Sequence, residues 1–127
     1  MENASGGSVA QGRDRSVCTN DEKGWLGPQV TMNDCAVKQS KKNDDVMIQL
    51  YDKQISTLKS GDVKDKLRKS QSAWISYRDS ACDYETMPVR EGSLAGWVKN
   101  LCLADLTEER ILRLKGYRNC TSSGCPE

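Results

Sequence analysis

Six cysteines in a chain of 127 residues restrict how this chain can fold more than any other feature. They are Cys18, Cys35, Cys82, Cys102, Cys120 and Cys125. An even number of cysteines in a small polar chain is typical of disulfides formed in an oxidising compartment. The alternatives are reduced thiols and a metal site, but the chain has no His and no Cys-x-x-Cys pair, which structural zinc sites normally use. We therefore expect three disulfides, no metal and no cofactor. Six cysteines allow 15 pairings, so the residues alone leave the pairing open.

The remaining composition indicates an exported binding protein with a small core. Hydrophobic residues make up 36% of the chain and Phe is absent, so covalent braces would help to hold the fold. The net charge of +1 provides no field toward nucleic acid or an anionic membrane. No apolar run approaches the roughly 20 residues of a membrane span. Met1 precedes the polar stretch 2–16 and not a signal peptide, so we expect that a cleaved signal preceded this sequence. The expected location is periplasmic or secreted.

The chain is expected to contain one helical domain over residues 18–120. Glycines interrupt residues 1–29, which predicts an irregular arm, disordered over residues 1–17, and residues 121–127 form a polar tail. Apolar residues at three-four spacing predict a first helix from Thr31, its N-cap, to Lys59. The polar gap at 38–45 is either a solvated stretch or a kink. Gly61 is expected to end this helix.

Two further amphipathic helices follow. The second is expected to begin at Asp62 as N-cap and to stop before Pro88. Its expected apolar stripe consists of Val63, Leu67, Ser70, Trp74, Tyr77, Ala81 and Tyr84. The third is expected to begin at Ser93 as N-cap, and Thr107 could start a fresh segment. The short turn 60–61 requires an antiparallel hairpin of the first two helices. The predicted fold class is all-α, a three-helix antiparallel arrangement with an irregular N-terminal arm, stapled by disulfides.

The chain contains no recognisable catalytic machinery. Without His, the commonest general base is missing, and nucleophile elbows and phosphate loops are absent. The acidic pairs 44–45 and 108–109 are adjacent residues, which point in different directions on a helix. We therefore expect that the protein is not an enzyme.

The segment around Trp74 is the densest in aromatic and charged residues. Trp74 and Tyr77 are three residues apart and would share a face, and Arg78 can lie beside the indole of Trp74. Asp79 is adjacent to Arg78, so we expect no pairing between them on one helix face. The favoured interpretation is structural, with aromatic core residues and salt bridges between helices. The alternative is a binding surface anchored by aromatics and Arg.

A second segment, Glu91-Gly92-Ser93-Leu94, precedes the third helix. A glycine before an N-cap permits a tight turn or the close approach of a partner. Ordinary loop chemistry is the favoured interpretation.

These motifs resemble the LprI-type lysozyme inhibitor family of bacterial exported proteins. The resemblance rests on Trp74-x-x-Tyr77-Arg78-Asp79-x-x-Cys82, then Gly92-Ser93, then Cys102-Leu103-x-x-Leu106-Thr107-x-x-Arg110, with Met32-Asn33-Asp34-Cys35-Ala36 upstream. It covers residues 18–118. The chain departs from the family's pattern where Glu91-Gly92-Ser93 replaces a common Gly-Gly-Ser and where Cys120 and Cys125 are added.

The resemblance implies a helical, exported protein that binds and occludes a lysozyme. It also implies the pairings Cys18–Cys35 and Cys82–Cys102, which leave Cys120–Cys125. The loop 87–93 would reach into the glycan cleft, and Arg78 or Arg90 would supply charge toward its carboxylates. The motif residues expected to bind are Trp74, Tyr77, Arg78, Asp79, Arg90, Gly92, Ser93, Thr107 and Arg110. The alternative is an envelope protein-interaction module without lysozyme activity, with an unknown partner.

Overall fold

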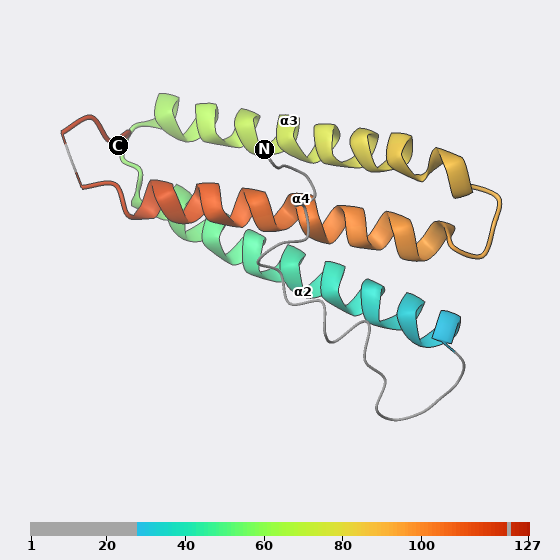
Figure 1. Cartoon of the computed structure of the whole chain (residues 1–127). Helices are drawn as coiled ribbons and strands as arrows, with labels where there is room; N and C mark the ends of the chain where they lie inside the picture. Colours follow the sequence, from blue (N-terminus) through green and yellow to red (C-terminus); the bar gives the residue numbers. More distant parts are fainter. Residues whose placement is uncertain (1–27, 122) are drawn as a thin grey trace, which may run out of the picture.

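The computed structural model describes residues 28–121 and 123–127 and shows three long helices (Figure 1). They are α2 (Pro28–Thr57), α3 (Gly61–Thr86) and α4 (Ala95–Arg118), with a short 3-10 helix, η1 (Met87–Val89), after α3. This part of the chain contains no strand, which confirms the all-α fold class. The predicted disordered arm (residues 1–17) lies outside the described residues. Cys18 does too, so its pairing with Cys35 stays a prediction.

Helix α2 is longer at its start and more continuous than predicted. It begins at Pro28 and not after Thr31, because proline is favourable at the first helical position. It ends at Thr57, two residues before the predicted Lys59. The helix runs unbroken through the polar gap, where Ser40 and Asn43 are buried and not solvated. Two polar residues of this gap therefore face the interior, whereas Lys38, Lys41, Lys42 and Asp45 are exposed.

Helix α3 begins two residues earlier than predicted. The N-cap is Ser60 and not Asp62: the backbone of Ser60 is extended, and its Oγ accepts a hydrogen bond from the Val63 N–H at 3.4 Å. Gly61 is thus the first residue of α3 and does not end α2. Asp62 lies in the first turn, where its negative charge suits the helix dipole. The end of α3 before Pro88 agrees with the prediction.

Helix α4 begins after Leu94 and not at Ser93. Its N-cap, Leu94, makes no side-chain hydrogen bond, and Ser93 is exposed in the preceding turn. Backbone hydrogen bonds shape this turn instead, since the Gly92 N–H donates to Val89 O and the Ala95 N–H to Gly92 O. The helix continues unbroken through Thr107, which is fully buried, so no fresh segment begins there.

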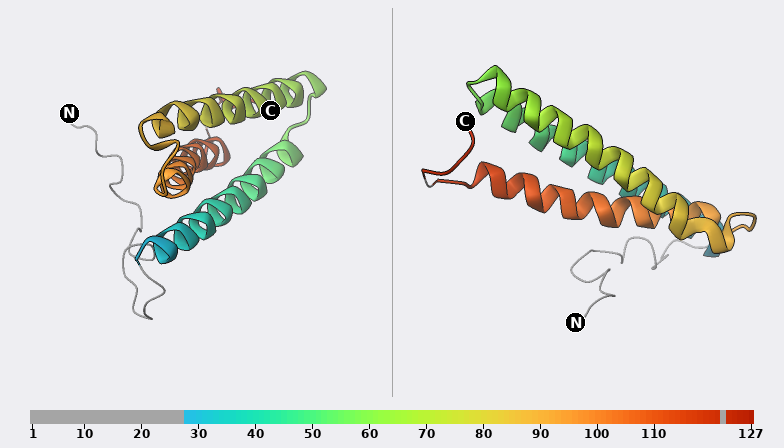
Figure 2. Two further views of the ribbon diagram at one scale, coloured as in Figure 1. Left: turned by 90° about the vertical axis from the view of Figure 1, so that its right-hand side faces the viewer. Right: turned by 90° about the horizontal axis from the view of Figure 1, so that it is seen from above.

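Helix α3 runs antiparallel to both α2 and α4 (Figures 1 and 2). The expected direction of the first two helices is therefore correct, but they diverge from their short connection and α4 packs against both. Most contacts join α2 to α4, where Met47, Ile111 and Leu114 form the apolar core. The predicted hairpin of α2 and α3 is thus open, because α4 supplies most of the apolar surface that α2 buries.

Two disulfides brace the described chain. Cys82–Cys102 is buried and joins the end of α3 to the start of α4, with 5.6 Å between the Cα atoms. Cys120–Cys125 closes a short loop in the tail. Both pairings agree with those that the family resemblance implies.

Candidate functional site

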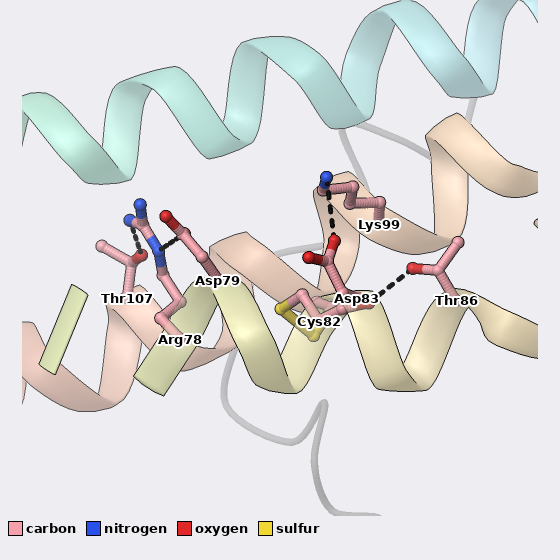
Figure 3. The surroundings of a disulfide bond; sticks show 8 residues. Arg78, Asp79, Cys82, Asp83, Thr86, Lys99 and Thr107 are labelled. Carbon is pink, nitrogen blue, oxygen red and sulfur yellow. Dashed lines mark hydrogen bonds and ion pairs between the residues drawn. A yellow bond between two sulfur atoms is a disulfide. The ribbon is translucent and has the colours of Figure 1, made fainter. Parts of the chain in front are cut away.

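Arg78 of α3 connects all three helices. Its side chain is only 11% exposed, and its Nη1 donates to Asp44 Oδ1 of α2 at 2.8 Å and to Thr107 Oγ1 of α4 at 3.2 Å. Its Nε donates to Asp79 Oδ1 at 3.0 Å (Figure 3). The expectation that Asp79 and Arg78 would not pair is therefore wrong. It considered only the directions in which the two side chains leave the helix, whereas the long Arg side chain lets Nε reach its neighbour.

Trp74 lies between two guanidinium groups. The Arg78 Cζ is 5.3 Å from the ring centroid of Trp74, and the Arg110 Cζ is 6.0 Å from it. Arg110 is buried, and it donates through Nε to Gln71 Oε1 at 3.0 Å and through Nη2 to Ser70 Oγ at 3.1 Å. Such contacts contribute about 0.5–2 kcal/mol each, more where the groups are desolvated. Trp74 and Arg110 therefore stabilise the packing of α3 on α4.

We call this set the polar interior and define it as Asp44, Trp74, Arg78, Thr107 and Arg110. Four of its members belong to the motif that resembles the lysozyme inhibitor family. The structure brings them together between the helices, with Arg78, Thr107 and Arg110 buried and Asp44 and Trp74 partly buried, which favours their structural interpretation. Family-specific residues in this chain thus include residues that hold the helices together.

The sequence reasoning missed the part of α2 that faces this interior. Asp44 pairs with Arg78, and Asn43 donates through Nδ2 to the carbonyl oxygen of Ala104 at 3.0 Å. Gln71 on α3 was missed as well. The polar gap at 38–45 could have indicated these contacts. Buried polar residues that interrupt an apolar stripe without ending the helix need polar partners on other helices.

Tyr77 and Tyr84 lie outside the bundle, 59% and 78% exposed. The predicted stripe through both is therefore wrong. Helix α3 turns Arg78, Cys82 and Thr86 inward, at four-residue spacing, and this leaves the positions before and after them at the surface. Two tyrosines seven residues apart share one exposed face of α3.

The link between α3 and α4 adds further exposed side chains to those of the two tyrosines. Met87 of η1 is 47% exposed, and Leu94 is exposed just before α4. Arg90 lies between them in the chain, its side chain 58% exposed. We define the loop surface as Tyr77, Tyr84, Met87, Arg90 and Leu94. Met87, Arg90 and Leu94 lie in the link between α3 and α4, which is at one end of the bundle (Figure 1), and Tyr77 and Tyr84 lie on α3 before it.

Several interactions hold the loop that carries this surface. Beneath it, the Cys82–Cys102 disulfide and the ion pair of Lys99 Nζ with Asp83 Oδ1, at 3.2 Å, join α3 to α4 (Figure 3). Thr86 Oγ1 donates to the Cys82 carbonyl oxygen at 2.6 Å. Within the loop, Arg90 Nη1 donates to the Met87 carbonyl oxygen at 3.0 Å. The loop therefore projects from helix ends that a disulfide and an ion pair hold together.

The remaining predicted residues, Gly92 and Ser93, are exposed in the same loop. A Cβ added to Gly92 would meet only Val89 O, at 3.7 Å, which is an ordinary contact. The fold therefore does not require glycine at this position.

Across the described residues, no group of three or more His, Cys, Asp or Glu side chains could hold a metal ion. No helix in the described ranges has the length and apolar character needed to cross a membrane. The loop surface provides exposed apolar and aromatic side chains and the guanidinium of Arg90.

Comparison with known proteins adds one family and one relative. The family described as "Lysozyme inhibitor LprI" matches residues 18–114. An uncharacterised protein of Rhizobium meliloti (strain 1021) is 29% identical over 99 residues, covering 68% of this chain and 71% of the relative. No solved structure matches the chain.

Proposed function

The chain belongs to the lysozyme inhibitor LprI family, and we propose that it is an exported protein that binds a lysozyme and occludes its glycan cleft. The match spans the three helices almost to the end of α4. The disulfides support export, because such bonds persist in oxidising compartments.

The observation that carries this proposal is the exposure of Tyr84 and Met87 beside a braced loop. Aromatic side chains dominate the binding energy of many protein interfaces. A base held by a disulfide also lowers the entropy lost when the loop is ordered by a partner. Both effects favour tight binding through a small surface.

Arg90 gives the loop surface a chemistry suited to a glycosidase cleft. Such clefts contain two carboxyl groups that flank the scissile bond. A guanidinium can donate two parallel hydrogen bonds to a carboxylate. Arg90 is exposed beside Met87, so it can enter the cleft while Met87 and Tyr84 cover the rim.

Local charge favours a basic lysozyme even though the whole chain carries only +1. Residues 79–91 contain four acidic side chains, Asp79, Asp83, Glu85 and Glu91. Asp79 pairs with Arg78 and Asp83 with Lys99, which leaves Glu85 and Glu91 near the single cation of Arg90. An acidic surround speeds association with a basic partner.

A lysis assay tests the proposal. Oxidised protein is titrated into lysozymes of different classes acting on cell-wall substrate, and dose-dependent loss of lysis is expected with at least one class. Tyr84→Ala/Met87→Ala should raise the inhibitory concentration by roughly tenfold or more, as for removal of interface hot spots. The matched control is Ile48→Ala/Leu112→Ala, which truncates two side chains that are also exposed but lie on α2 and α4.

The outcomes separate the two functions under consideration. If Tyr84→Ala/Met87→Ala inhibits as well as Ile48→Ala/Leu112→Ala, the inhibitory site lies outside the loop surface. If wild-type protein with intact disulfides inhibits no lysozyme, the proposal fails and an envelope interaction module becomes the better interpretation.

A further inference from the structure

The charges of this chain are unevenly distributed along the bundle. One end contains the last turn of α2, the link to α3, the first turns of α3 and the last turns of α4 (Figure 1). Residues 52–69 and 113–118, which we call the basic pole, hold nine Lys and Arg side chains and three acidic ones. We propose that the basic pole binds the surface of an anionic lipid bilayer.

The cations of the basic pole are mostly available. Arg68 pairs with Asp65 at 2.7 Å. No other Lys or Arg of the pole forms an ion pair with a residue that the structure describes. The exposed cations of the pole are Lys53, Lys59, Lys66, Arg68, Lys69, Arg113, Lys115 and Arg118, and Lys64 is half-buried.

Helix stability does not explain these charges. Lys115 and Arg118 suit the C-terminal end of α4, where cations are favourable. Lys64, however, ends the first turn of α3, where the helix dipole favours acidic side chains. The helix dipole therefore does not account for a lysine at this position.

The electrostatic field of the basic pole is separate from that of the charges at the other end of the bundle. Helix α3 has 26 residues, which corresponds to about 39 Å at 1.5 Å per residue. The Debye length at physiological ionic strength is about 8 Å, so charges at the far end are screened from the pole. The expectation from the net charge, that no field would attract the chain to an anionic membrane, considered the chain as a whole and not the charge at this end.

The kind of cation and its neighbours favour a lipid surface. Most of the cations are lysines on flexible stems spread over three helices and the link between α2 and α3, an arrangement that suits a charged plane more than a single anion. Leu112 is exposed on α4 and Tyr117 is half-buried near the same end, which adds apolar contact at a bilayer interface. Binding through this pole leaves the loop surface at the opposite end of the bundle, directed away from the lipid.

Sedimentation with vesicles tests the proposal on the full chain. We expect binding to vesicles of equimolar phosphatidylcholine and phosphatidylglycerol, little binding to phosphatidylcholine alone, and weakening as salt is raised. Lys66→Gln/Lys69→Gln should reduce the affinity for anionic vesicles about thirtyfold, because each cation near such a surface contributes about 1 kcal/mol. The control Lys41→Gln/Lys42→Gln removes the same charge from exposed sites in the middle of α2 and should bind as wild type.

Three results would overturn the proposal: no binding to anionic vesicles at low salt, equal loss in both variants, or binding to a soluble anionic polysaccharide with none to vesicles. Inhibition of lysozyme in solution should be the same for both variants and wild type. Failure of the basic pole is therefore distinguishable from failure of the proposed inhibitory function.

Discussion

Arg78 of α3 and Asp44 of α2 form a 2.8 Å ion pair across two helices that otherwise contact one another little. The same guanidinium donates to Thr107 of α4, so a single side chain joins the three elements. Arg78 is largely buried while Asp44 is partly exposed, so the carboxylate keeps some hydration and the pair avoids the full cost of burying two charges.

Replacing Arg78 by Ala should lower the free energy of unfolding by about 2–3 kcal/mol, since hydrogen bonds to charged groups are lost and Thr107 keeps a buried hydroxyl without this partner. Urea denaturation measures the change. Arg68→Ala is the matched control, because it removes an exposed pair with Asp65 and should cost less than about 1 kcal/mol. Unchanged stability of Arg78→Ala together with lost lysozyme inhibition would assign Arg78 to binding instead.

Replacing Arg110 by Lys should destabilise the protein by about 1–2 kcal/mol even though the charge is kept. An ammonium cannot reproduce the two hydrogen bonds to Gln71 and Ser70 or the stacking beside Trp74. Thermal unfolding measures this. The exposed Arg113 offers the same exchange without these contacts, and Arg113→Lys should stay within about 0.5 kcal/mol of wild type. Equal effects at the two positions would contradict a specific role for Arg110.

The number of helices and their order could be predicted from the sequence, because apolar residues at three-four spacing and the stop at Pro88 are local signals. The Cys82–Cys102 pairing came with the family resemblance. Helix starts were less accurate. At Ser60 and Asp62, two residues of cap-forming type stand two positions apart, and only the extended backbone of Ser60 decides between them.

The faces of α3 could not be predicted in the same way. Counting apolar and aromatic residues as core placed Tyr77 and Tyr84 inside, whereas the buried face contains Gln71 and Arg78. A polar interior gives no hydrophobic stripe, and its members are recognised only when their partners on other helices are known. The loop 87–93, Arg90 and Tyr77 were among the residues expected to bind, whereas the predicted stripe gave no sign that Tyr84 is exposed beside them.

The two described disulfides should differ in both reduction and stability. Cys82–Cys102 is buried and closes a loop of 20 residues, so its removal by Cys82→Ala/Cys102→Ala should cost about 3 kcal/mol. Cys120–Cys125 closes a short loop of the exposed tail, and Cys120→Ala/Cys125→Ala should cost at most about 2 kcal/mol. Under a titration of reductant followed by thiol alkylation and mass mapping, the tail cysteines should be labelled first. Earlier labelling of Cys82 would contradict the buried position of its sulfur.

Replacing Gly92 by Ala should separate the needs of the fold from those of a partner. A Cβ at this position has only an ordinary 3.7 Å contact with Val89 O, so the free energy of unfolding should change by less than about 0.5 kcal/mol. If Gly92 allows a lysozyme to approach the loop backbone closely, the added methyl group should weaken inhibition in the lysis assay by roughly tenfold. The control Gly116→Ala lies in α4 near the other end of the bundle with nothing within 4 Å of the added Cβ. It should raise stability by about 0.5–1 kcal/mol and leave inhibition unchanged. Full inhibition by a stable Gly92→Ala variant would place the contact with the enzyme elsewhere on the loop surface, on the side chains of Tyr84, Met87 or Arg90.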